Sequence, residues 1–152
     1  MGRDMPQLKI VIPFYHHIKE KRSYKKVSIF HIMSKNVSHR LDSRVDRKTG
    51  KRVYRRFPND NYTRLLKEIC IMIRSKGIKF HVPDKPIANE IILTYTVYKP
   101  THNGDSFNLL DGLADAVKEV IGIDDRYFAC GGITTVIEKN NPRIELIICQ
   151  NQ

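Results

Sequence analysis

Acidic residues gather in one window of an otherwise basic chain. Residues 105–125 contain five aspartates and one glutamate but a single lysine, so this window has a net charge of −5 and the rest of the chain +16. Carboxylates within about 4–6 Å of one another repel, which raises their pKa values and lowers stability. A hard divalent cation such as Mg²⁺ or Mn²⁺ removes this repulsion and prefers oxygen ligands. The window therefore indicates a metal site suited to phosphodiester chemistry.

A helix over residues 107–121 is expected to carry most of these acids. On a helical wheel one arc is polar and is predicted to face solvent: Asn108, Asp111, Asp115, Lys118 and Glu119. The opposite arc is predicted to pack on a sheet: Phe107, Leu110, Leu113, Ala114, Val117, Val120 and Ile121. Asp105 precedes the helix, near its positive end, and Asp124 and Asp125 follow Gly122. The acids form one patch if the chain folds back along the helix; otherwise they are its solvated face.

The remaining pattern predicts one α+β domain over residues 1–152, with two main helices packed on a small mixed or antiparallel sheet of about four strands. The other main helix, earlier in the chain, is expected to begin at Asn59 or Asp60 and to end at Lys76–Gly77. The expected strands cover residues 7–13, 27–33, 88–100, 131–139 and 143–150, the last two joined by a turn at 140–142.

Residues 19–57 form a basic arm with a turn expected at Gly50. Within residues 19–56 there are 14 Lys and Arg against three acids. Such a segment binds a polyanion, because neutralised phosphates release counterions, or it is a solvated surface. The candidates for contacting the DNA backbone are Lys48, Lys51, Arg52, Arg55 and Arg56, together with Lys118 and Arg126 beside the acids.

Several classes of protein are disfavoured. The chain has no run of about 20 apolar residues that would span a membrane. Its first residues are too polar for a secretory signal. The three cysteines are widely spaced and form no CxxC pair, which argues against a zinc site or a disulfide framework. A cytoplasmic protein is expected.

One pattern resembles a known family. Asp105-x-x-Asn108, then Asp115-Ala116, then Asp124-Asp125 and two terminal strands resemble the RusA family of Holliday junction resolvases, over about residues 93–149. The resemblance implies a small homodimeric endonuclease that uses Mg²⁺ and cuts four-way DNA junctions by paired incisions. Such enzymes are often encoded by phages or prophages. The expected metal ligands are Asp105, Asp124, Asp125 and Asp111, with Asp115 as a further ligand or as a neighbour of the ligands.

Two positions depart from the family pattern. Phe107 stands where the family has a second aspartate, and Asp111 stands where it has a lysine. We expect the ring of Phe107 to join the core-facing arc and Asp111, one turn onward, to supply the missing carboxylate. Lys118 or the arm would replace the lysine. The departures leave open a non-cleaving, structure-selective DNA-binding protein and, more remotely, a basic assembly module such as a phage packaging factor.

Overall fold

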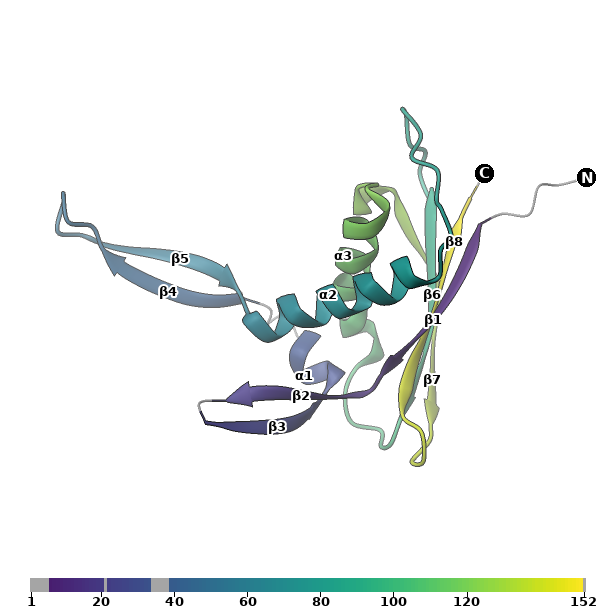
Figure 1. Ribbon diagram of the computed structural model, residues 1–152, viewed down its shortest axis with the longest axis horizontal. Coiled ribbons are helices and arrows are strands. Elements are labelled where there is room, and N and C mark those ends of the chain that lie inside the picture. The colour runs from purple at the N-terminus through teal and green to yellow at the C-terminus, as the bar shows by residue number, and fades with distance from the viewer. Residues whose placement is uncertain (1–5, 21, 34–38, 152) are drawn as a thin grey trace, which may run out of the picture.

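A four-stranded sheet with helices on one face forms the body of the protein (Figure 1). The computed structural model of the chain describes residues 6–20, 22–33 and 39–151, with the backbone alone at 20, 39–44 and 53–58. The strand order is β1-β8-β6-β7, where β1 is Gln7–Pro13, β6 is Ile91–Lys99, β7 is Phe128–Ile137 and β8 is Arg143–Gln150. Strand β8 is antiparallel to β1 and β6, whereas β7 is parallel to β6. The predicted α+β class, with a mixed sheet, is confirmed.

The parallel pair β6–β7 determines where the second main helix lies. Parallel neighbours need a connection that crosses back along the sheet, and this connection contains helix α3 (Leu110–Ile121). Helices α1 (Ile29–Met33) and α2 (Asp60–Ser75) cover the same face (Figure 1). Asn59 caps α2 as expected, since its side chain accepts the Asn61 N–H at 2.9 Å.

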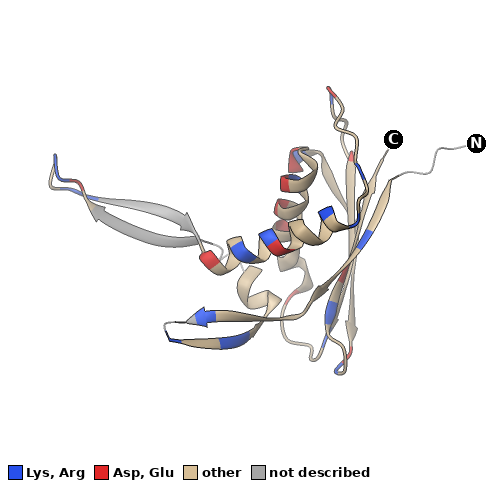
Figure 2. Cartoon of the chain, viewed as in Figure 1, with Lys and Arg blue, Asp and Glu red and all other residues tan. Residues whose placement is uncertain are grey.

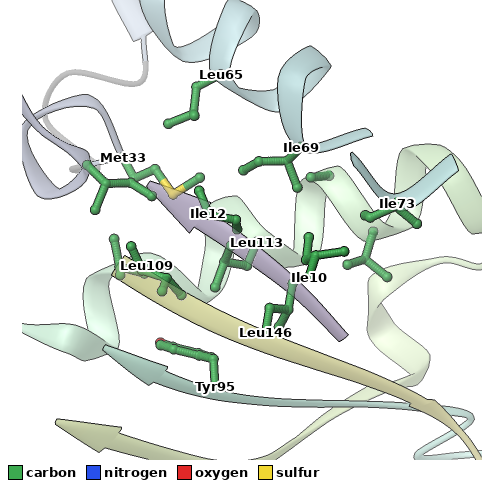
Figure 3. Close-up of a cluster of buried hydrophobic side chains, with 14 of the residues drawn as sticks. Ile10, Ile12, Met33, Leu65, Ile69, Ile73, Tyr95, Leu109, Leu113 and Leu146 are labelled. Atoms are coloured by element: carbon green, nitrogen blue, oxygen red, sulfur yellow. The ribbon is translucent and has the colours of Figure 1, made fainter. Parts of the chain in front are cut away.

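The core lies between this face and the helices (Figure 3). Every second residue of β6 and β8 is buried, as period-2 strands require. Ile10, Leu146 and Tyr95 lie opposite one another across β1, β8 and β6. Leu113 of α3 and Ile69 of α2 are both buried in the same cluster. The helices are therefore fixed to the sheet by apolar contacts.

Truncation of Leu113 should destabilise the whole domain. Its side chain is fully buried, so Leu113→Ala leaves a cavity between α3 and the sheet and should lower the free energy of unfolding by about 2–5 kcal/mol. Urea denaturation followed by circular dichroism measures this change. Ile71→Ala, on the exposed side of α2 with 64% of its residue surface accessible, is the matched control. Equal effects of the two changes would contradict the assignment of this core.

Two β-hairpins project from the body on the same side (Figure 1). The first hairpin pairs β2 (Tyr15–Glu20) with β3 (Ser23–Ser28), and the second pairs β4 (His39–Val45) with β5 (Arg52–Pro58). The predicted turn at Gly50 is confirmed: its φ is +69°, and its N–H donates to the Asp46 carbonyl at 2.8 Å. The basic arm thus contains most of the first hairpin and nearly all of the second.

The strand predicted at 27–33 is wrong. Strand β3 ends at Ser28, and Ile29–Met33 is helix α1. Ile29, Ile32 and Met33 are buried at helical spacing, so burial on one side of a helical turn overrides the β propensity of this apolar run.

The terminal hairpin predicted from residues 131–150 is also absent, because β6 lies between β7 and β8. Strand β8 buries every second side chain and takes an interior position, whereas every residue of β7 is exposed or half-buried and this strand takes the edge. In the described part of the chain, no helix is long and apolar enough to cross a membrane.

Candidate functional site

The loop between β6 and Asp105 is held by two buried side chains of β6. Lys99, only 5% exposed, donates from Nζ to the Gly104 carbonyl at 2.7 Å and to the His102 carbonyl at 3.3 Å. The Tyr95 hydroxyl donates to the Ser106 carbonyl at 2.7 Å. These bonds fix the loop on both sides of Asp105.

Asp105 itself caps a short 3₁₀ helix, η1 (Ser106–Leu109). Its carboxylate accepts the Phe107 N–H at 3.0 Å. The Ser106 hydroxyl lies 2.7 Å from the Thr135 hydroxyl of β7, which ties η1 to the sheet edge. Asp105 is exposed, so its carboxylate is accessible at the start of the η1–α3 segment.

The expected burial of Phe107 is wrong: 69% of this residue is exposed. The wheel assumed an α-helix from residue 107, but residues 106–109 form the tighter 3₁₀ helix, which turns Leu109 inward in place of Phe107. The premise that Phe107 and Asp111 exchange roles on a regular helix therefore fails, and whether Asp111 replaces a carboxylate stays a prediction.

The buried side of α3 is also wider than predicted, because α3 contacts other helices as well as the sheet. Gly112 and Ala116 are buried. A Cβ at Gly112 would lie 2.9 Å from Met33 Sδ, and the Cys70 thiol donates to the Ala116 carbonyl at 3.4 Å. Small residues at these two positions let α1 and α2 approach α3.

The polar side of α3 faces solvent, as predicted. Asp111, Asp115, Lys118 and Glu119 are all exposed. Asp115 has a defined partner, since its Oδ2 accepts the Tyr62 hydroxyl of α2 at 2.7 Å. Burial raises the pKa of the Tyr62 hydroxyl, and the hydrogen bond to Asp115 raises it further. The phenol therefore stays protonated and donates. Asp115 therefore links α3 to α2 while it remains at the surface.

Asp124 and Asp125 follow the C-terminal end of α3. Gly122 ends the helix with φ +81°, and its N–H donates to the Lys118 carbonyl at 2.9 Å. Asp124 then caps η2 (Asp125–Tyr127) by accepting the Arg126 N–H at 3.0 Å, a bond that lowers the pKa of Asp124. This carboxylate is therefore ionised at neutral pH.

Two of the basic residues that the sequence analysis predicted to contact DNA, Lys118 and Arg126, lie beside these acids. Lys118 Nζ is 3.6 Å from Asp125 Oδ1, and Arg126 Nε is 3.6 Å from Asp124 Oδ1. All four side chains keep at least 41% of their surface exposed, so these ion pairs are weak, about 0–1 kcal/mol each. They can exchange for contacts with another charged molecule.

The predicted ligands are not gathered at one place in a single chain. Asp105 precedes η1 and Asp124 follows α3, whose 12 residues span about 18 Å at roughly 1.5 Å per residue. Asp124 and Asp125 stay at the carboxyl end of α3, and the chain returns along the helix only as β7, a strand without acidic residues whose Thr135 reaches Ser106. Within residues 6–20, 22–33 and 39–151, no group of three or more His, Cys, Asp or Glu side chains could hold a metal ion. A metal shared by Asp105 and Asp125 of one chain does not fit this arrangement.

The predicted basic residues of the arm divide into two groups. Lys48, Lys51 and Arg52 lie exposed at the tip of the second hairpin, which carries blue at its end in Figure 2. Arg55 and Arg56 lie on β5, and their side chains are outside the described part of the structure.

The sequence analysis missed three side chains that hold the acidic segment in place through hydrogen bonds: Lys99, Tyr95 and Tyr62. A signal existed for Lys99: it continues the inward alternation Leu93, Tyr95, Val97 on one face of β6. The bond between Tyr62 and Asp115 joins residues 53 positions apart, and no local pattern indicates it.

No protein-family model matches this chain, and no curated protein matches it significantly. The likeness to the RusA family therefore rests on the residue pattern given in the sequence analysis and stays a prediction.

Loss of the Lys99 ammonium should increase local opening of the backbone around Asp105 but not around Asp124. In Lys99→Met two carbonyls lose their donor, so the Phe107 amide that Asp105 caps should exchange about tenfold faster, as expected for ~1–2 kcal/mol of hydrogen bonding. Amide hydrogen exchange by NMR measures it, with the Arg126 amide as the internal control and Lys139→Met as the surface control. A uniform rise at both amides would show that Lys99 supports the whole fold and not this loop.

Proposed function

We propose that this protein is a metal-dependent endonuclease that cuts branched DNA, in particular a four-way junction. The observation that carries the proposal is the row of exposed carboxylates along α3 and at both of its ends, in a chain whose net charge is +11. Figure 2 shows acidic residues along α3 and basic residues on the hairpins. An acidic surface repels DNA unless a cation lies between them, and a metal-dependent nuclease uses such a cation for catalysis.

The adjacent pair Asp124–Asp125 is the best candidate for holding Mg²⁺, or Mn²⁺, on one chain. Mg²⁺ in phosphoryl-transfer sites is usually held by one or two carboxylates, water and phosphate oxygens, so a cage of three protein ligands is not required. When bound, the ion would activate water and stabilise charge on the phosphate. Asp115, in the middle of α3, is held by Tyr62, and Asp111, in the first turn of α3, lies too far from this pair to bind the same ion and would belong with Asp105.

The basic residues beside the acids support a division in which bases bind phosphate and acids bind the cation. Lys118 and Arg126 form exposed ion pairs, and the Arg126 guanidinium also lies 5.4 Å from the centre of the Tyr127 ring; these contacts are weak enough for an approaching phosphate to attract both side chains. Asp125 and Asp124 would then be released to bind the cation. Lys48, Lys51 and Arg52 would contact the backbone and position the DNA without reading its sequence.

Neutralisation of the pair should separate binding from cleavage. In Asp125→Asn, cleavage of a synthetic four-way junction in Mg²⁺ should fall roughly 100-fold, the order observed when a group that stabilises transition-state charge is removed. Binding should be kept or tightened, because one repelling charge is lost. Gel assays of nicking and binding test both, with Asp84→Asn in an exposed loop as the matched control. Cleavage at the wild-type rate by both Asp124→Asn and Asp125→Asn would contradict the assignment.

A homodimer would supply two sites for paired incisions and would also solve the separation of the acids. In a two-fold dimer, each residue of one copy has an equivalent in the other, so Asp105 of one protomer can lie beside Asp125 of its partner. The sheet face opposite the helices is open (Figure 1) and carries exposed Val11, but α3 lies on the other face, so a shared site needs an interface that includes the ends of α3.

Mixing two inactive variants tests whether a site is shared. Asp105→Asn and Asp125→Asn should each be inactive alone, but their heterodimer would contain one site without either substitution, so the mixture should regain nicking of one strand. Light scattering should give about twice 17.7 kDa. A wild type that cuts while the mixture stays inactive would show that the two ends of α3 do not share a site.

A non-cleaving, structure-selective DNA-binding protein is the second candidate. It is favoured by Phe107, which stands exposed where the family pattern has an aspartate, and by the separation of Asp105 from Asp124. Junction binding without nicking in either Mg²⁺ or Mn²⁺ would establish it.

A further inference from the structure

The excess positive charge of the chain lies almost entirely on the two hairpins. Residues 15–28 contain five Lys and Arg and one acid, a net charge of +4, and residues 39–58 contain eight and two, a net charge of +6. Together they hold +10 of the chain's +11, so the body is nearly neutral. The first hairpin, residues 15–28, is therefore a basic element of its own, separate in space from the second hairpin tip that carries Lys48, Lys51 and Arg52 (Figure 1).

The first hairpin has two different faces. Ile18 and Val27 are buried and attach one face to the body. The strand pairing opposes Lys19 with Tyr24, His17 with Lys26, and Tyr15 with Ser28. Directly opposed residues in an antiparallel pair share a face. The other face therefore presents Tyr15, His17, Lys19, Tyr24 and Lys26, all of them exposed.

Aromatic and basic side chains alternate on this exposed face. Tyr24 is 70% exposed, and Lys26 Nζ lies 4.4 Å from the centre of the Tyr15 ring, a cation–π contact that orients the lysine. Tyr15 also packs edge-on against the buried Phe14 ring, with the ring centres 5.0 Å apart, so its position is fixed. Ile18 and Val27 on the opposite face attach the hairpin to the body, and this attachment does not need the Tyr24 ring or the two lysines.

We propose that the first hairpin is a DNA-contact ribbon that enters the major groove of a duplex arm through Tyr15, His17, Lys19, Tyr24 and Lys26. The proposal rests on the DNA binding proposed above and extends it to a surface not included there. The major groove of B-DNA is about 12 Å wide and admits a two-stranded β-ribbon. The lysines contact phosphates and the tyrosine rings pack on sugars or base edges. Since both hairpins project on the same side (Figure 1), one DNA molecule can contact both.

The test measures binding by fluorescence anisotropy at several salt concentrations, with chelator present so that cleavage does not occur. Lys19→Gln with Lys26→Gln should weaken binding to a DNA duplex and reduce the slope of log K against log salt by about 0.9 for each lost phosphate contact. Lys85→Gln with Lys139→Gln removes the same charge from exposed sites on the body and should leave the slope unchanged. Lys19→Arg with Lys26→Arg keeps the charge and should restore it.

Two further measurements separate a groove contact from general attraction. Tyr24→Ala should lower affinity without changing the salt slope, because it removes a ring but no charge. An RNA duplex of the same sequence should bind more weakly than DNA, because the major groove of A-form RNA is too narrow for side chains to read. Equal binding of the two duplexes, or an effect of the Lys19 and Lys26 changes no larger than that of the body pair, overturns the proposal.

These outcomes are independent of the outcome for the proposed nuclease. A wild type that cuts junctions in Mg²⁺ while the hairpin variants bind like the body pair keeps the nuclease and removes the ribbon. A wild type that shows the expected slopes but never cuts keeps the ribbon and removes the nuclease. Circular dichroism of each variant confirms that the fold is intact before binding is compared.

Discussion

The parallel pairing of β6 and β7 is the constraint on which the candidate site depends. Parallel neighbours cannot be joined by a tight turn, so the connection must run back along the sheet, and α3 is the helix in that connection. The same crossover places Asp105 at the carboxyl end of β6 and Asp124–Asp125 at the amino end of β7. The geometry that buries Leu113 in the core therefore also separates the acids. A cation site within one chain is limited to what one end of α3 offers, and a site using both ends needs a second chain.

Elements with their own period were predictable from the sequence, and the pairing of distant elements was not. Helix α2, strand β6 and the polar side of α3 were confirmed because each carries its pattern locally. The order β1-β8-β6-β7 depends on how distant strands pack against one another. Because β7 and β8 follow each other in the sequence, the sequence analysis wrongly predicted that they pair. The outward position of Phe107 depends on a 3₁₀ turn that begins the helical segment, which a uniform wheel of 100° per residue does not contain.

For the candidate site, the sequence indicated which residues carry charge and that they are exposed, but not what holds them. The loop before Asp105 is fixed by Lys99 from the end of β6, and Asp115 is fixed by Tyr62 from another helix. Both contacts arise only once the chain is folded. The alternation of β6 did predict which of its side chains point into the core, however. Lys99 follows Tyr95 and Val97 on that side, which indicates a buried ammonium that needs hydrogen-bond acceptors. A buried ammonium of this kind determines the path of the adjacent loop, because the loop must place backbone carbonyls within hydrogen-bonding distance of it.

The basic and acidic residues of the chain do not neutralise one another, because the β-hairpins hold the basic residues away from the acids of α3. Strand β5 has seven residues, which at about 3.3 Å each make a projection of roughly 23 Å. The Debye length at physiological salt is about 8 Å, so the basic tip of the second hairpin and the acids of α3 neither pair nor cancel through solvent. Packed on one surface, they would form salt bridges and present little net field. Held apart, the hairpins can attract a polyanion while the acids of α3 remain available to a cation, which explains why a basic chain can place its acids in one window.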